Sequence, residues 1–303
     1  MRKQAAGADL AGLTALLPSW ELHLRAERKS PATIKSYGDG VRRYLAFCAE
    51  QAAEPLLRTT LNAFVVALLD EGAEPATARS RQLAVRRYSA WLAEEGEIGA
   101  DPFLGIKAPR LDVRVVTPLS DEQLKALVKA CAGPDFRDRR DEAIVRLMIE
   151  TGARAGEIVT MRLDDLDLAA GRAVVVRGKG GKGRVVPFGP HTAKAIDRYI
   201  RARRGHSLAD SPWLWLGERG KSFSYDALHK TLAHRAGLAG IQGFHPHKLR
   251  HTAAHRWLAA GGSEGGLMAV AGWTRPDMLL RYTRAQAADR AAAEAAGLNL
   301  GDL

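Results

Sequence analysis

The sequence has little cysteine and no long apolar run, and both shortages exclude classes of protein. Only two cysteines, Cys48 and Cys131, occur in 303 residues, and neither has neighbours at metal-ligand spacing, which argues against a disulfide framework or a zinc site. Both stand in helix-like apolar contexts, so we interpret them as core residues of a protein from a reducing compartment. No stretch reaches the ~18 apolar residues of a membrane span. The N-terminus has a basic start but no continuous apolar run after it, because Asp9 and Gly12 interrupt the run, so no signal peptide is expected. A cytoplasmic protein is predicted.

Acidic residues are also in deficit. The chain has 45 Lys and Arg against 34 Asp and Glu, a net charge of +11, which favours a polyanionic partner, most simply nucleic acid. An acidic membrane surface is a weaker alternative, because no basic amphipathic helix with a bulky apolar face stands out. The first 112 residues carry 15 Lys and Arg against 14 Asp and Glu, and the remainder carries 30 against 20. The length allows two domains.

The N-terminal third has the pattern of an all-α helical bundle. We expect a flexible segment over residues 1–15 and helices within 16–106, one of which begins at Ser30-Pro31 with serine as N-cap and proline in the first turn. Further helical runs cover 59–69 and 77–94. The clustered cations of this region are typical of a solvated helix face. Because the region is nearly neutral overall, their local concentration is equally compatible with a DNA-contacting face. The candidate DNA-binding residues are Lys35, Arg42, Arg43, Arg79, Arg81, Arg86 and Arg87.

A proline-broken linker over residues 107–117 precedes a second region, residues 118–303, that mixes helices with a short β-hairpin. Ser120 and Gln123 form a capping-box pattern at its first helix. Residues 141–150 read as a buried helix. Residues 172–177 and 184–188 are β-rich and flank a glycine-rich turn. The pattern is helical again from residue 192 and ends in an alanine-rich segment. The expected fold is therefore mainly α with a small β-sheet (α+β), joined to the all-α bundle.

Five short blocks in this second region carry groups that can act on a phosphodiester. Each block alone has an ordinary structural explanation: a surface ion pair, a solvated loop or a core aromatic residue. The histidines around 247 lack a His-Glu-x-x-His pattern and have no carboxylate nearby in sequence, so we expect no metal. The blocks contain Arg154 with Glu157, Lys179 followed by Lys182 and Arg184, His247 with Arg250, Trp273 after Gly272, and Tyr282.

Taken in order, these blocks closely resemble the tyrosine recombinase (phage-integrase type) family. The resemblance covers residues 118 to about 290, and the N-terminal helices are similar to the core-binding domain of that family. The departures are mild. Ala153 stands where leucine is usual, Gly156 where serine is common, and Trp273 where histidine is more frequent.

The chemistry of strand cleavage suits these residues. Arg154 and Arg250 can neutralise the phosphate with paired hydrogen bonds. Tyr282, with a reference pKa of about 10, needs a base or a positive environment to act as nucleophile, and His247 is the candidate general base. Lys179 can protonate the departing 5′-oxygen. Glu157 is expected to anchor Arg154 or the hairpin. Trp273, which cannot transfer protons, is given a contact or packing role, and Lys182 and Arg184 are further DNA-binding candidates.

The resemblance implies a site-specific DNA recombinase that works through a 3′-phosphotyrosyl intermediate without metal, ATP or other cofactor. The expected partner is double-stranded DNA, clamped by both domains. We expect a monomer or weak oligomer when free and a homotetramer on synapsed DNA, with the tail 286–303 docked on a neighbouring protomer or packed in cis. Accessory DNA-bending proteins are compatible with this interpretation, as is location at the nucleoid. With about 15 residues before the first helix, no arm-binding domain is expected. The alternatives are a type IB topoisomerase and an inert DNA-binding regulator.

Overall fold

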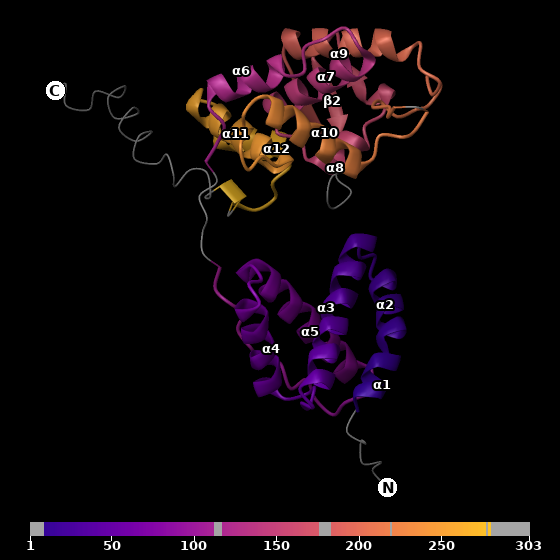
Figure 1. Ribbon diagram of the computed structural model, residues 1–303, viewed down its shortest axis with the longest axis vertical. Helices are drawn as coiled ribbons and strands as arrows, with labels where there is room; N and C mark the ends of the chain where they lie inside the picture. Colours follow the sequence, from indigo (N-terminus) through magenta and orange to yellow (C-terminus); the bar gives the residue numbers. More distant parts are fainter. Residues whose placement is uncertain (1–8, 112–116, 176–182, 219, 277, 280–303) are drawn as a thin grey trace, which may run out of the picture. The chain divides into compact units, whose positions relative to one another are not determined.

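The computed structural model describes residues 9–111, 117–175, 183–218, 220–276 and 278–279. The chain divides into two compact units, residues 1–113 and 114–303, and each is described by itself (Figure 1). Within the described part, no helix combines the length and the apolar character needed to cross a membrane.

The N-terminal unit consists of helices over its described residues, as its sequence predicts. The helices are α1 (Leu10–Ala15), α2 (Leu17–Ala26), α3 (Pro31–Glu50), α4 (Arg58–Asp70) and α5 (Pro75–Glu94) (Figure 1). The expectation of a flexible segment up to residue 15 is wrong for residues 10–15, which form α1. Leu13 of this helix is 1% exposed, and its carbonyl accepts a hydrogen bond from the hydroxyl of Tyr88. Burial of one leucine and a tertiary hydrogen bond order a segment whose local pattern is weak.

The long helices α3 and α5 lie side by side at the centre of this unit (Figure 1). Gly40 permits their close approach, because a Cβ atom there would lie 2.7 Å from the Cβ of Ala84. Trp20 of α2 packs nearby with its ring centroid 5.0 Å from that of Tyr88. The predicted start of α3 is confirmed: Ser30 accepts a hydrogen bond from the Thr33 N–H at 3.1 Å, with Pro31 in the first turn. The two helices therefore form a rigid frame for the cations that they carry.

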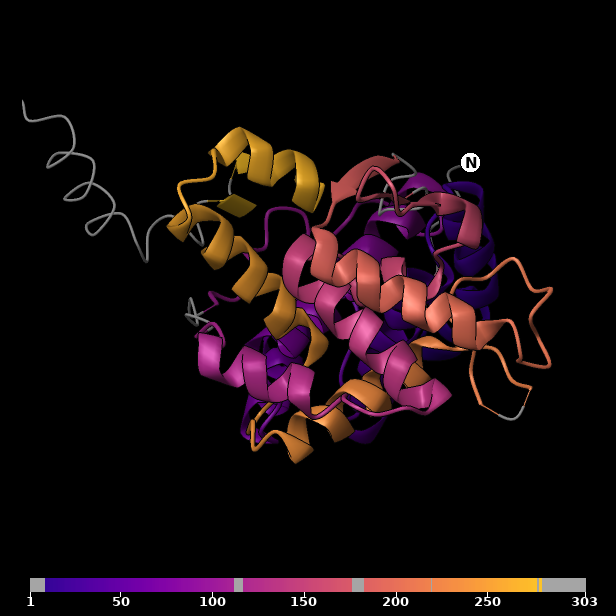
Figure 2. The same cartoon turned by 90° about the horizontal axis from the view of Figure 1, so that it is seen from above.

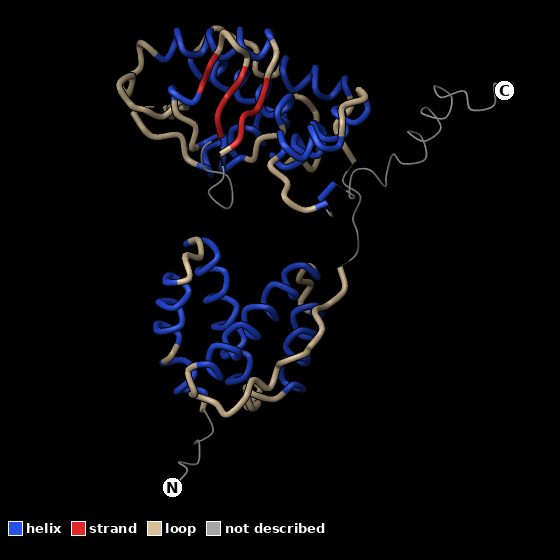
Figure 3. The backbone as a smooth tube through the Cα atoms, turned by 180° about the vertical axis from the view of Figure 1, so that it is seen from behind, coloured by secondary structure: helices blue, strands red, loops and turns tan. Residues whose placement is uncertain are grey.

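The second unit is mainly helical with a small sheet, which confirms the expected α+β class. Its elements are α6 (Asp121–Lys129), α7 (Phe136–Thr151), α8 (Ala155–Val159), the 3₁₀ turn η1 (Leu163–Asp165), β1 (Leu166–Asp167), β2 (Arg172–Val175), β3 (Arg184–Pro187), α9 (Pro190–Arg203), α10 (Tyr225–Leu238), α11 (Pro246–Ala259) and α12 (Glu264–Ala271). The antiparallel sheet has the order β1-β2-β3 (Figure 3). The predicted hairpin is present, since Arg172 pairs with Pro187 and Val175 with Arg184. The turn over residues 176–182 lies outside the described residues.

Helix α7 is the central element of this unit and packs beside α9 and α11 (Figure 2). Ile144 and Leu147 on it are fully buried. The predicted capping box is present at α6, where Ser120 and Gln123 exchange hydrogen bonds between side chain and backbone. Cys131 lies in the core as expected, and burial raises the pKa of its thiol to about 12, which makes it a poor nucleophile. The buried α7 thus fixes the position from which the first candidate block emerges.

Candidate active site

The turn after α7 presents Arg154. Gly152 ends the helix with a φ of 61°, and a Cβ atom there would lie 3.2 Å from the Cβ of Ala253 on α11. Glycine is therefore favoured both by the left-handed backbone and by the close approach of α11. Arg154 is the N-cap residue of α8. Its guanidinium donates to Glu157 Oε1 at 2.8 Å, and its backbone N–H donates to Oε2 at 2.7 Å.

Glu157 joins this turn to the hairpin. Arg184 at the start of β3 donates from Nη1 to Oε1 at 2.8 Å and from Nη2 to Oε2 at 2.7 Å. The carboxylate of Glu157 is buried and accepts four hydrogen bonds, two on each oxygen. Burial by itself raises its pKa, but the hydrogen bonds and charges of Arg184 and Arg154 outweigh burial and lower the pKa to about 2. Glu157 is ionised at neutral pH and contacts both elements proposed for it from the sequence.

Arg250 connects three of the candidate blocks. This side chain on α11 is 2% exposed. Its Nη1 donates to the carbonyl of Gly152 at 2.9 Å, and its Nη2 donates to the carbonyl of Ala271 at 2.7 Å. Its guanidinium carbon also lies 5.3 Å from the ring centroid of Trp273, which is buried immediately after the end of α12. Arg250 thus fixes the end of α12 to the turn that carries Arg154.

His247 lies in the first turn of α11, directly after Pro246, which begins the helix. Its ring is nearly perpendicular to that of His251, with the two centroids 4.8 Å apart. Burial, and then the neighbouring His247, lower the pKa of His251 to about 4, so that this imidazole is neutral at pH 7. His251 is part of the sequence block that carries the family resemblance, but the sequence interpretation gave it no role, although a spacing of four on a helix places it on the same face as His247.

The described residues therefore bring together Arg154, Glu157, Arg184, Arg250 and Trp273, and α11 carries both His247 and Arg250. They come from the turn between α7 and α8, from α8, from β3, from α11 and from the segment directly after α12. Lys179, Lys182 and Tyr282 lie outside the described residues.

The cations of the N-terminal unit gather along α3 and α5, but acidic residues accompany several of them. Lys35 pairs with Asp39 at 3.0 Å, and Arg42 contacts both Glu21 at 2.9 Å and Asp39 at 3.0 Å. Arg43 pairs with Glu71 at 3.0 Å, and Arg81 donates to the Ser36 carbonyl at 3.2 Å. Arg79 and Arg87 are exposed, whereas Arg86 is half-buried. Exposed ion pairs contribute only about 0–1 kcal/mol, so a phosphate can compete for these cations.

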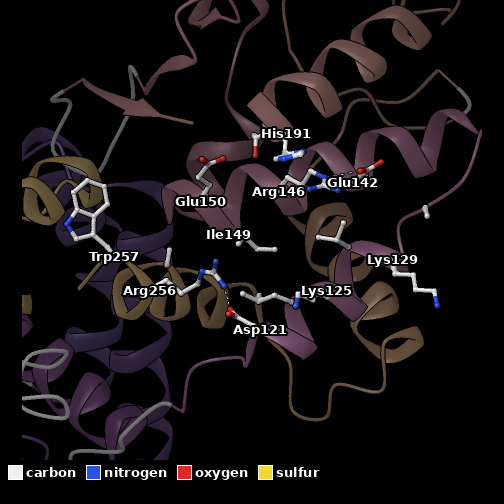
Figure 4. A pocket seen from close by; sticks show the side chains of 15 residues that line it. Asp121, Lys125, Lys129, Glu142, Arg146, Ile149, Glu150, His191, Arg256 and Trp257 are labelled. Atoms are coloured by element: carbon white, nitrogen blue, oxygen red, sulfur yellow. Dashed lines mark hydrogen bonds and ion pairs between the residues drawn. The ribbon is translucent and has the colours of Figure 1, made fainter. Parts of the chain in front are cut away.

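A pocket of about 750 Å³ lies on another part of the second unit, bounded by residues of α6, α7, α9 and α11 (Figure 4). Its wall carries both signs of charge, including the ion pair between Arg256 and Asp121. Among the candidate catalytic residues that the structure describes, Arg154, His247, Arg250 and Trp273 do not line it. It is therefore separate from the arginine cluster.

Comparison with known proteins agrees with this arrangement. The model of the phage integrase family matches residues 118–289, and that of the phage integrase N-terminal SAM-like domain matches residues 17–96. A tyrosine recombinase XerC from Pseudomonas fluorescens is 30% identical over 242 residues, covering 78% of this chain and 80% of that recombinase. This chain belongs to the phage integrase family of tyrosine recombinases.

Two solved structures share the fold. One is the Tn1549 transposon integrase in complex with transposon right-end DNA, at a TM-score of 0.71 and 18% identity, covering 94% of this chain and 99% of that one. The other is a lambda integrase dimer bound to a core site, at a TM-score of 0.71 and 15% identity, covering 89% of this chain and 94% of that one. At these identities the likeness concerns the fold.

Proposed function

We propose that this chain is a site-specific DNA recombinase that cleaves and rejoins DNA strands through a 3′-phosphotyrosyl intermediate. The observation that supports this most strongly is the contact of Arg250 with the Gly152 carbonyl at 2.9 Å. It ties one arginine to the turn that presents the other, although Arg154 and Arg250 lie 96 positions apart in the sequence. Two guanidinium groups held on one framework suit a single phosphate, whose charge rises in the transition state of displacement.

In the proposed reaction Arg154 and Arg250 hold the scissile phosphate. The phenolic oxygen of Tyr282 attacks the phosphorus, and the bond to the 5′-oxygen of the next nucleotide breaks. His247 accepts the phenolic proton, and Lys179 donates a proton to the departing oxygen. The new phosphotyrosyl ester retains the energy of the phosphodiester bond. A 5′-hydroxyl from a second strand can therefore displace the tyrosine, with proton transfers reversed and with no ATP.

The DNA partner engages both units in this proposal. The cations of α3 and α5 contact phosphates and a groove, and the basic second unit surrounds the scissile step. A homotetramer on synapsed DNA, with the tail 286–303 docked on a neighbouring protomer, provides the four active sites that strand exchange requires. Accessory DNA-bending proteins would shape the synapse, and the enzyme would act at the nucleoid in the cytoplasm. The DNA-bound integrases of the same fold support the DNA-binding part.

Two rival activities use the same fold. A type IB topoisomerase would relax supercoiled DNA by the same covalent step, and an inert regulator would bind DNA without cleaving it. The XerC relative and the integrase neighbours favour recombination. An assay with two recombination sites on one plasmid, run beside a supercoil-relaxation assay, separates the first rival. The formation of a covalent adduct separates the second.

The decisive experiment uses a suicide duplex, nicked so that the released 5′-end diffuses away and the protein stays attached to DNA. The wild-type chain should yield a denaturation-resistant protein–DNA adduct, whereas Tyr282→Phe should yield none because it lacks the attacking oxygen. Tyr225→Phe is the matched control, since Tyr225 is a half-exposed tyrosine at the start of α10, and it should form adduct normally. No adduct with wild type, or an adduct with Tyr282→Phe, would refute the assignment.

Salt dependence tests the role of the cations separately. Each phosphate contact should make log K fall by ~0.9 per tenfold rise in salt. Replacing Arg79 or Arg87, the two exposed cations of α5, should reduce this slope by about that amount. A slope unchanged by both substitutions would exclude Arg79 and Arg87 from the DNA contact.

A further inference from the structure

Arg184 differs from the other DNA-binding candidates in how completely its guanidinium is used. Its side chain is 10% exposed. Nη1 and Nη2 donate to the two oxygens of Glu157, and Nε donates to the carbonyl of Val270 at 2.6 Å. One side chain on β3 thus fastens α8 and α12 together. All three guanidinium nitrogens of Arg184 therefore already donate to acceptors within the protein.

Gly272 leaves the space that Arg184 occupies. A Cβ atom at this position would lie 3.0 Å from the Cδ of Arg184 and 3.1 Å from its Nε and Nη1. The glycine also ends α12 with a φ of 65°, immediately before Trp273. The residue that ends α12 is therefore fitted to the guanidinium, and the backbone leading to Trp273 is fixed against it.

The charges explain why a second arginine is useful here. Without Arg184, the carboxylate of Glu157 would pair with Arg154 alone and cancel the charge that a phosphate requires. With Arg184, one carboxylate lies between two guanidinium groups and the cluster keeps one positive charge. Arg154, whose side chain is 31% exposed, is the more accessible of the two. The charge that remains is thus available at Arg154.

We propose that Arg184 is a positioning residue for strand cleavage rather than a DNA-contacting cation: it holds Glu157, and through Glu157 it orients Arg154 and leaves its charge free for the phosphate. The proposal rests on the function proposed above, in which Arg154 binds the scissile phosphate. It replaces the sequence-based expectation of a direct phosphate contact. The two interpretations predict opposite results for the same substitutions.

The test compares Arg184→Lys with Arg172→Lys, a matched control on the neighbouring strand β2 with a side chain 57% exposed and paired with Asp167. Lysine keeps the charge but has a single nitrogen in place of the planar guanidinium, so it cannot reproduce the bidentate contact with Glu157 together with the Val270 contact. Thermal melting first confirms that each variant is folded at the assay temperature. The rate of adduct formation is then measured at saturating suicide duplex, together with the affinity for intact duplex.

Arg184→Lys should form adduct ~100-fold more slowly, as expected for a small displacement of a phosphate-binding group, with unchanged affinity for duplex. Arg172→Lys should match the wild type in both. Arg184→Gln should retain the wild-type salt slope. A wild-type rate for Arg184→Lys, or a salt slope reduced by ~0.9 in Arg184→Gln, would overturn the proposal.

Gly272→Ala, which crowds Arg184 without removing it, should slow adduct formation at unchanged affinity, and a wild-type rate for it would also count against the proposal.

A readout independent of cleavage separates this proposal from the proposed function. The side-chain Nε–H resonance of Arg154 in the free protein should shift in Arg184→Lys and stay in place in Arg172→Lys. If the wild type forms no adduct, the recombinase assignment fails while this resonance still decides whether Arg184 orients Arg154. An unmoved resonance in Arg184→Lys would refute the positioning role even in an active enzyme.

Discussion

Replacing Glu157 by glutamine should destabilise the second unit strongly at neutral pH. The pKa of this buried carboxyl falls from 4.5 to about 2 in the folded protein, a difference worth ~3 kcal/mol at ~1.4 kcal/mol per pKa unit. Removal of one partner from a buried ion pair typically costs ~3–5 kcal/mol, which agrees with the value from the pKa shift. For a unit of this size the melting temperature should fall by roughly 6–12 °C.

The direction of the pKa shift determines how the stability contributed by Glu157 changes with pH. Because folding lowers the pKa of Glu157, its contribution to stability is fully present above pH ~4.5 and is lost as the pH falls towards 2. The difference in unfolding free energy between wild type and Glu157→Gln should therefore be constant from pH 6 to 8 and shrink below pH ~4.5.

Urea unfolding at several pH values measures this difference directly. Asp197→Asn is the control: Asp197 is 51% exposed and pairs with Arg201 on α9, so its loss should change stability by at most ~1 kcal/mol. If Glu157→Gln unfolds at the wild-type urea concentration at pH 7, the four hydrogen bonds do not stabilise the fold as argued.

Three further substitutions test other parts of the site. Arg250→Lys loses the pair of carbonyl contacts and should slow adduct formation ~10²–10³-fold at saturating duplex; a rate within tenfold of wild type would contradict the role of Arg250. Gly152→Ala places a Cβ atom 3.2 Å from Ala253 at a φ of 61° and should lower stability by ~1–2 kcal/mol in thermal melting, whereas an unchanged melting temperature would show that the turn relaxes easily. Folding lowers the pKa of His251 from 6.5 to about 4, so the free energy of unfolding of the wild type should fall as the pH drops from 6.5 to 4. The variant His251→Phe should show a smaller fall over this pH range. An equal fall in both proteins would refute the assignment to His251.

Local sequence rules predicted the structural features that depend only on neighbouring residues in the chain. The cap at Ser30, the proline in the first turn of α3 and the capping box of Ser120 and Gln123 are all present. These features depend on hydrogen bonds within four residues or on the backbone freedom of a single residue, so the sequence carries them directly. The short hairpin was predictable for the same reason.

Tertiary partners were not predictable in this way. Arg184 follows a glycine-rich loop and looks like a solvated cation, yet its partners Glu157 and Val270 lie 27 and 86 residues away in the chain. Asp141 is fully buried between Arg140 and Arg235, an arrangement that a helical run of charges does not reveal. A charged residue in sequence is equally compatible with solvent, phosphate or a buried partner, and only the fold distinguishes these.

The two backbone contacts of Arg250 have a consequence for evolution as well as for catalysis. A guanidinium already restrained by the carbonyls of Gly152 and Ala271 would lose little further rotational freedom on binding a phosphate, so in the proposed reaction Arg250 meets the substrate preorganised. The same donors close the ends of two helices. If Arg250 binds the phosphate as proposed, selection for reactivity and selection for a folded domain act on one side chain, and a change at this position would damage both at once.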